Sequence, residues 1–318
     1  MQAKQITVFG GSGFLGRHAV RALAKEGWRI KVACRHPHRA FFLRPLGQVG
    51  QIAPIKCDVT NPDEVEAALH GSAAIVNLPG ILYPRGQSFE EVHVTGADNV
   101  AQAAARLGIA AMVHVSAIGA GTESESRYAR TKTEGETRIR AAFPAATILR
   151  PSIVFGPEDQ FFNTFAALAR FSPALPLIGG GHTRFQPVFV GDVAAAICAA
   201  LGHPQAPGRT YELGGPTIYS FRELMQIVLR ETGRKRLLVP LPFWLASFKA
   251  FFLQLAPKPL LTPDQVTLLR QDNVVAPTAL TLADLGIRPT TVEAEVPAYL
   301  WRFRAKGEYA DLAQGRAG

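Results

Sequence analysis

Short runs of β-branched residues alternate with longer stretches of helical periodicity through the first half of the chain, and this alternation constrains the fold most strongly. We expect strands within residues 5–10, 29–35, 52–59, 73–80, 110–117 and 146–156. Helices are expected between them, within residues 14–27, 61–71, 89–108 and 124–143. Strand–helix alternation at this spacing predicts right-handed βαβ crossovers and a mostly parallel, doubly wound sheet of the Rossmann-like α/β class.

The alternation stops near residue 155, where proline and glycine begin to cluster and the later elements follow irregularly. We therefore expect a Rossmann-like domain over residues 1–155, a smaller α/β lobe over 156–304 and a flexible tail over 305–318. Strands from later residues are also allowed to return to the first sheet. Open α/β sheets bind ligands at the carboxyl edge of their strands, so the second lobe is expected to serve a substrate or a partner.

Composition narrows the functional class. Apolar residues make up 47% of the 318 residues, enough for a large core, and the net charge of +9 favours phosphates, acidic proteins or membrane surfaces as partners. Lysine and arginine are scattered rather than in blocks, so we expect no nucleic acid as a partner. Cys34, Cys57 and Cys198 form no CxxC pair and no two histidines have metal spacing, so neither a disulfide framework nor a metal site is predicted.

Two features of the sequence bear on its location. A predicted strand begins almost at the first residue and leaves no room for a signal peptide. No apolar run approaches the roughly 18 to 20 residues that a membrane-spanning helix needs. The protein is therefore expected to be cytoplasmic.

An aromatic segment follows later in the chain. Trp244, Phe248, Phe251, Phe252 and Leu255 recur at helical spacing. Aromatic stripes usually belong to a core, so a buried helix over about residues 240–261 is the favoured interpretation. The alternative is a partly exposed helix that docks on a membrane protein or lies in the bilayer interface.

A glycine-rich loop points to a ligand. Gly10, Gly13 and Gly16 follow the first predicted strand directly and open the first predicted helix. Glycine lets the backbone turn tightly and approach a pyrophosphate, while the helix N-terminus offers free N–H groups and a positive dipole end. In this strand–turn–helix context the pattern predicts a nucleotide site rather than an ordinary turn.

The end of the second strand bears on which dinucleotide is bound. A carboxylate there would accept hydrogen bonds from a ribose 2′-hydroxyl and repel a 2′-phosphate, but this chain has Cys34 and Arg35 and no acid. Arg35 can pair with a 2′-phosphate, although a solvated surface arginine is a serious alternative. NADP(H) is therefore preferred, and NAD(H) stays open. Asp58 ends the third strand, where it either accepts from an adenine amino group or caps a local turn.

Tyr128 and Lys132 form an acid–base candidate. They are four residues apart on a predicted helix, so both side chains lie on one helix face. A nearby ammonium stabilises a phenolate and so lowers the pKa of a tyrosine. The pair follows the fifth strand of a nucleotide-binding pattern, which favours a functional role over chance surface spacing.

Several motifs together resemble a known family. GGSGFLG, CDV, HVSA, YARTK and RPSIVFGP are similar to motifs of the extended and atypical short-chain dehydrogenase/reductases, which include NAD-dependent epimerases and dehydratases; the likeness covers at least residues 5–200. More narrowly, VNLPGIL, RYARTKTEGE and FQPVFVGDVA resemble the large nucleotide-binding accessory subunit of respiratory complex I and its bacterial relatives. This narrower resemblance implies a structural NADPH binder, with complex I as partner and a place on the cytoplasmic face of the inner membrane.

The resemblance also implies which residues contact the cofactor. They lie in the glycine loop, at strand ends, on the Tyr–Lys helix and after the sixth strand: Gly10, Ser12, Gly13, Phe14, Leu15, Gly16, Arg35, Asp58, Val59, Leu78, Pro79, Tyr128, Lys132, Pro151 and Ile153.

The catalytic serine departs from the family pattern. Active members commonly use the second hydroxyl of a Ser-Ser pair after the fifth strand, and that position is Ala117 here. Ser116 is the adjacent candidate, but a shift of one residue turns a side chain to the other face unless the strand ends first. Losing such a donor costs about 10² to 10³ in rate.

Two hypotheses follow from these residues. The preferred one is a tight NADP(H) binder that supports or assembles a respiratory complex. The other is a free-standing oxidoreductase or epimerase with Tyr128 as acid/base, Lys132 as the group that lowers its pKa and Ser116 as donor.

Overall fold

The computed structural model describes residues 4–84, 86–257, 259–305 and 307. The chain divides into two compact units. Unit 1 comprises the described residues of Met1–Pro151, Val190–Leu213 and Val275–Arg288, and unit 2 those of Ser152–Phe189, Gly214–Val274 and Pro289–Gly318. Residues 190–213 and 275–288, which lie beyond the expected boundary at residue 155, belong to unit 1. Most of the expected tail, residues 306 and 308–318, lies outside the described residues.

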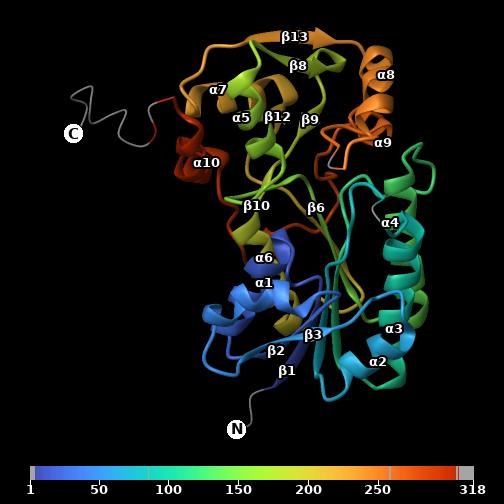
Figure 1. The fold of residues 1–318 in the computed structure, drawn as a ribbon. Coiled ribbons are helices and arrows are strands. Elements are labelled where there is room, and N and C mark those ends of the chain that lie inside the picture. Colours follow the sequence, from blue (N-terminus) through green and yellow to red (C-terminus); the bar gives the residue numbers. More distant parts are fainter. Residues whose placement is uncertain (1–3, 85, 258, 306, 308–318) are drawn as a thin grey trace. The chain divides into compact units, whose positions relative to one another are not determined.

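Unit 1 contains a seven-stranded sheet in the order β11-β6-β5-β4-β1-β2-β3 (Figure 1). Each pairing in it is parallel. The strands are β1 (Gln5–Phe9), β2 (Arg29–Cys34), β3 (Ile52–Lys56), β4 (Ala74–Asn77), β5 (Ala111–Val115), β6 (Thr147–Pro151) and β11 (Thr210–Leu213). The expected doubly wound parallel sheet is confirmed, since six of its strands follow the order 3-2-1-4-5-6 of dinucleotide-binding folds.

Helices cover both faces of this sheet. One group packs together through α2–α3 and α3–α4 contacts, and α1 packs on α6; Figure 1 shows the two groups on opposite sides. The helices are α1 (Phe14–Lys25), α2 (Pro62–Leu69), α3 (Gly96–Arg106), α4 (Arg127–Ala142) and α6 (Val190–Gly202), with a 3-10 segment η1 (Pro37–Leu46) after β2 and η4 (Ala283–Leu285) in the last return.

Local signals explain several helix ends. The Asn61 side chain accepts hydrogen bonds from the backbone N–H groups of Asp63 and Glu64, and Pro62 occupies the first turn of α2. Gly27, just after α1, has a φ of +82°, a left-handed conformation that favours glycine. Ser126 caps α4 by accepting from the N–H of Ala129.

Two predicted elements differ from the structure. The helix expected from residue 89 begins as a π-helix, η2 (Glu90–Thr95), before α3 continues it. The single strand expected over residues 146–156 is wrong: β6 ends at Pro151, which has no N–H to continue the ladder. A separate strand β7 (Val154–Phe155) pairs with β10 (Val188–Phe189) inside unit 2.

Unit 2 consists of short strand pairs and helices around its own aromatic core. Besides β7–β10, β9 (Arg184–Phe185) pairs with β12 (Tyr219–Ser220), and β8 (Ala174–Ile178) pairs with β13 (Leu237–Leu241). Its helices are α5 (Phe161–Phe171), η3 (Gly179–Gly181), α7 (Phe221–Glu231), α8 (Phe243–Leu253), α9 (Pro263–Leu268), α10 (Val292–Leu300) and η5 (Trp301–Phe303). Phe155, Phe162 and Phe221 are buried at its centre.

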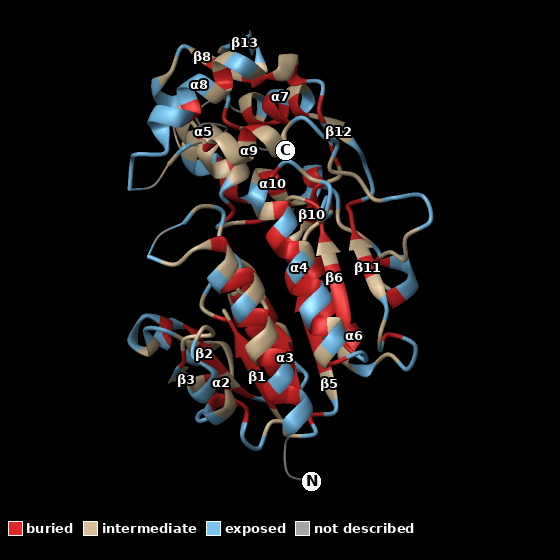
Figure 2. Cartoon of the chain, turned by 90° about the vertical axis from the view of Figure 1, so that its right-hand side faces the viewer, coloured by how far each residue is buried: buried red, intermediate tan, exposed pale blue. Residues whose placement is uncertain are grey.

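The aromatic segment is the clearest departure from expectation. Phe248 is 60% exposed and Phe251 is 56% exposed, so the favoured interpretation of a buried aromatic stripe is wrong. Instead α8 buries two alanines, Ala246 and Ala250, and turns its large side chains outward. Figure 2 shows α8 with much of its length coloured as exposed. In the part of the chain that the structure describes, every helix is too short or too polar to cross a bilayer.

Candidate functional site

The loop between β1 and α1 has a shape that only glycine allows. Gly10 has a φ of +72°, and its carbonyl accepts a hydrogen bond from the N–H of Gly13 at 3.0 Å. A Cβ on Gly16 would lie 2.4 Å from Gly10 O and 2.6 Å from the Gly11 backbone. Any side chain at position 16 would therefore force the loop away from the start of α1, where free N–H groups are found.

The end of β4 adjoins this loop. The N–H of Leu78 donates to Phe9 O, and a Cβ on Gly10 would lie 3.2 Å from the backbone nitrogen of Pro79. The predicted contacts Leu78 and Pro79 therefore lie next to the glycine loop. The predicted contacts in the first turn, Ser12, Phe14 and Leu15, are half-buried, and Gly13 is exposed.

Arg35 is tied to Asp58 through a glutamine. The Arg35 guanidinium donates to Gln87 Oε1 at 2.7 Å, and Gln87 Nε2 donates to both carboxylate oxygens of Asp58 at 2.9 Å. Asp58 also accepts from the backbone N–H and the hydroxyl of Thr60. Burial raises the pKa of Asp58, but the bonds from Thr60 and Gln87 and the Arg35 charge lower it more. The two bonds from Thr60 form the local turn that the sequence offered as the alternative role of Asp58.

A surface hollow of about 450 Å³ adjoins Arg35 and Asp58. Basic side chains from the ends of β2 and β3 face it together with two acids, and its lining is Arg35, His36, Lys56, Asp58, Thr60, Asn61 and Glu64. The charge in the hollow is therefore mixed. Val59, beside it, packs its side chain near Gly96, where a Cβ would lie 2.8 Å from Val59 Cγ2.

Lys132 is buried beneath the ends of β4 and β5. Its side chain is 4% exposed and Nζ donates to Val115 O at 2.9 Å. A Cβ on Gly80, in the loop after β4, would lie 3.9 Å from Nζ. Burial lowers the pKa of Lys132 to about 8, against the opposing charge of Glu136. Lys132 is therefore a buried cation at neutral pH that faces the loop after β4.

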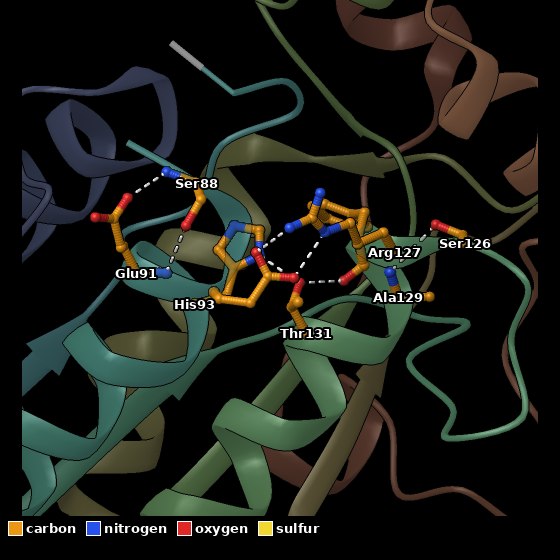
Figure 3. Close-up of polar contacts among 9 residues, drawn as sticks. Ser88, Glu91, His93, Ser126, Arg127, Ala129 and Thr131 are labelled. Carbon is orange, nitrogen blue, oxygen red and sulfur yellow. Dashed lines mark hydrogen bonds and ion pairs between the residues drawn. The ribbon is translucent and has the colours of Figure 1, made fainter. Parts of the chain in front are cut away.

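His93 joins three elements around Lys132. Its Nε2 accepts from the N–H of Ile81 at 3.0 Å, and its Nδ1 lies 3.0 Å from Thr131 Oγ1 (Figure 3). The Thr131 hydroxyl donates to Tyr128 O, so it must accept from His93, which assigns the proton to Nδ1. Burial, with the charge of Lys132, lowers the pKa of His93 to about 3. His93 is therefore a neutral imidazole that fastens η2 to the β4 loop and to α4.

Tyr128 lies beside this histidine. Its ring meets the His93 ring edge-on at 5.4 Å and the Phe89 ring at 6.1 Å, and the residue is half-buried. The close approach of α4 to η2 depends on Gly135 in α4, where a Cβ would lie 2.1 Å from His93 O in η2. The structure thus gathers Tyr128 and Lys132 around His93.

Two buried polar atoms in the same region have no hydrogen-bond partner among the described residues. They are Ser116 Oγ and Asn77 Oδ1. The Nδ2 of Asn77 donates a hydrogen bond to His114 Nδ1 at 3.1 Å. Burial keeps the pKa of His114 well below its usual value. Buried polar groups are nearly always satisfied, so such atoms mark a place for a water molecule or a ligand. β5 ends at Val115, one residue before Ser116, while Ala117 is half-buried.

A buried ion pair fixes α4 behind Lys132. Glu136, 4% exposed, accepts two hydrogen bonds from Arg150, at 2.9 Å from Nε and 2.6 Å from the terminal nitrogen. This paired carboxylate raises the pKa of Arg150. The pair joins the middle of α4 to β6. The remaining predicted contacts are Pro151, at the end of β6, and Ile153, which belongs to unit 2.

Sequence reasoning missed four side chains of this site: Asn77, Gln87, His93 and His114 as a partner of Asn77. Each depends on contacts between distant segments. A weak signal existed for Asn77 and His114, because polar residues at the carboxyl ends of adjacent parallel strands are brought to one edge.

A family model described as the NAD dependent epimerase/dehydratase family matches residues 6–214. A mitochondrial protein of Arabidopsis thaliana, NADH dehydrogenase (ubiquinone) 1 alpha subcomplex subunit 9, is 38% identical, with coverage of 95% of this chain and 78% of that protein. A ceramide reductase of Caulobacter vibrioides is 32% identical over 74% of this chain and 73% of its own.

Solved structures share the fold at lower identity. The dTDP-glucose 4,6-dehydratase of Streptomyces venezuelae, solved with NAD bound, has a TM-score of 0.71 and 20% identity, and the match covers 94% of this chain and 96% of that one. At this identity the likeness supports the architecture alone.

Proposed function

We propose a function from one premise: the chain belongs to the NAD dependent epimerase/dehydratase family. We infer that it binds a nicotinamide dinucleotide and serves NADH:ubiquinone oxidoreductase as an accessory or assembly protein. The observation that carries this proposal is the 38% identity over 95% of the chain to a subunit of NADH dehydrogenase (ubiquinone).

The residues present fit a dinucleotide. The glycine loop leaves a cradle at the start of α1 that a Cβ on Gly16 would fill. The unpartnered Ser116 hydroxyl and the buried ammonium of Lys132 offer donors at the ends of β4 and β5. The glycine loop would hold the pyrophosphate, and Lys132 a ribose hydroxyl. When bound, the group supplies a hydride donor or acceptor.

The finer proposal is a preference for NADP(H) over NAD(H). Arg35 and Lys56 place positive charge around one hollow, and β2 ends without an acid. Gln87 now holds Arg35 through one hydrogen bond to a neutral amide oxygen, and a phosphate would replace that oxygen with an anionic acceptor, which binds a guanidinium more strongly. We also propose that the protein acts at the cytoplasmic face of the inner membrane, where it would meet NADH:ubiquinone oxidoreductase.

A second candidate function is a free-standing NADP(H)-dependent oxidoreductase or epimerase. The ceramide reductase relative and the unpartnered Ser116 hydroxyl favour it. In this case Tyr128 would move a proton at its phenol oxygen, Lys132 would stabilise the phenolate, and Ser116 would donate to a substrate oxygen.

The first experiment is a cofactor assay on freshly purified protein. The protein is denatured, any released nucleotide is identified, and NADPH and NADH are titrated into the apo form. Stoichiometric NADP(H) that exchanges slowly is the expected result. Weakly bound nucleotide that exchanges quickly, together with turnover that Tyr128→Phe abolishes, would establish the second candidate instead.

Two variants test the preference for NADP(H). Arg35→Ala is expected to weaken the binding of NADPH at least about tenfold and to leave the affinity for NADH nearly unchanged, because only NADPH carries the 2′-phosphate. Arg29→Ala, an exposed arginine at the other end of β2, is the matched control. Equal loss of both nucleotides in Arg35→Ala would contradict the preference.

A further inference from the structure

The outward face of α8 carries an exposed stripe of large apolar side chains. We define the aromatic stripe as Trp244, Phe248, Phe251, Phe252 and Leu255, which are 71%, 60%, 56%, 55% and 78% exposed. Their spacing of four, three, one and three residues places them on one side of the helix and of the turn that follows it. Contiguous exposure of this kind marks an interaction surface.

The inward face shows why the stripe stays outside. Ala246 and Ala250 are fully buried against Ile178 and Val266, so small side chains seat the helix closely on unit 2. The rings outside also contact one another: the Phe248 and Phe252 centroids are 5.2 Å apart, and those of Phe251 and Phe252 are 5.5 Å apart. The stripe is thus a formed apolar surface rather than scattered side chains.

The charge around the stripe identifies the occupant. From Thr232 to Pro263 the sequence has five Lys or Arg and no Asp or Glu. Lys249, on α8 itself, is exposed. The same segment exposes Leu237 and Leu260, at 72% and 65%. Aromatic and leucine side chains combined with basic residues, in the absence of acids, favour the interface of an anionic bilayer.

We propose that α8 binds the surface of an anionic lipid bilayer, with the aromatic stripe inserted at the headgroup boundary and Lys249 near lipid phosphates. The 11 residues of α8 extend only about 16 Å, too short to span the apolar core, so the helix lies in the interface. A second copy is disfavoured as occupant, because a two-fold contact would bring the same basic segment against itself.

Flotation with lipid vesicles tests this proposal. Full-length protein is mixed with vesicles of phosphatidylcholine alone or with added phosphatidylglycerol. We expect flotation that increases with phosphatidylglycerol and decreases with salt. The double variant Trp244→Ser/Phe251→Ser is expected to lower binding at least about tenfold, and Lys249→Glu to remove most of the gain from phosphatidylglycerol.

The controls separate a lipid surface from other occupants. Phe41→Ser, which removes a 45% exposed phenylalanine in unit 1, is expected to float like the parent. Unchanged urea midpoints show that the variants are folded. Absence of flotation, or a double variant that floats like the parent, would overturn the proposal. The proposal would also be overturned if the protein did not bind vesicles but used the aromatic stripe to self-associate or to bind detergent-solubilised NADH:ubiquinone oxidoreductase. These readouts do not depend on nucleotide binding.

Discussion

Replacing Lys132 by methionine is expected to stabilise the apo protein at neutral pH, although it removes a candidate functional group. Burial lowers the pKa of this ammonium from 10.5 to about 8. That difference corresponds to a penalty of about 3 kcal/mol for the charged form in the folded state. Methionine has a similar length and no charge, but it forfeits the hydrogen bond to Val115 O, which contributes about 1 kcal/mol. The net gain is therefore about 2 kcal/mol.

The gain depends on pH with a definite sign. Below about pH 8 the lysine is charged in both the folded and the unfolded state, so the full penalty applies. Between about 8 and 10.5 the unfolded chain keeps the proton that the folded state has lost, so the stability of the parent rises with pH. Above that window the penalty is gone, and the variant is expected to be less stable than the parent by about 1 kcal/mol.

Urea unfolding of both proteins at about pH 7 and about pH 10 measures this difference, since other titrating groups cancel in the comparison. Lys25→Met, at the exposed end of α1, is the control and is expected to change stability by less than about 0.5 kcal/mol. A Lys132→Met variant that loses the same stability at both pH values would refute the reasoning, because the buried ammonium would then carry no penalty.

Three further substitutions test other parts of the site. Gly16→Ala is expected to lower the unfolding free energy by about 1–3 kcal/mol and to abolish nucleotide retention, whereas Gly202→Ala, which has open space for a Cβ, leaves both nearly unchanged; urea unfolding and nucleotide release decide this. Glu136→Gln breaks the buried pair with Arg150 and is expected to cost about 3 kcal/mol in urea unfolding; a loss below about 1 kcal/mol would contradict it. Ser116→Ala is expected to leave the urea midpoint unchanged, because its hydroxyl has no partner among the described residues; in an enzyme it would lower turnover by about 10² to 10³.

The parts of the fold that the sequence predicted well depend on neighbouring residues. The strand–helix alternation is a local pattern, and it reappears with small changes in the bounds of its elements. The return of β11 to the sheet is different, because its pairing with β6 joins residues about sixty positions apart. No local pattern distinguishes such a strand from one that stays in the second unit.

The helix α8 shows a limit of another kind. Its outward and inward faces are both apolar, so hydrophobic periodicity alone gives no direction. The rule that aromatic residues are usually core then selects the wrong face. The deciding feature is size: the small side chains of Ala246 and Ala250 let the helix lie close to Ile178 and Val266. A pattern of small residues opposite large ones is therefore a better guide to such a surface than hydrophobicity.

The candidate site combines both situations. The i and i+4 spacing of Tyr128 and Lys132 can be read from the sequence, but the groups around them cannot, because His93 and His114 come from other elements. Burial holds both imidazoles neutral, so the Lys132 ammonium stands beside uncharged rings. The Lys132 cation at the Val115 carbonyl and the unpartnered hydroxyl of the following residue, Ser116, suit a ribose hydroxyl as well as a substrate oxygen. The same arrangement therefore serves a structural binder and an enzyme, and the exchange rate of the dinucleotide is the quantity that separates them.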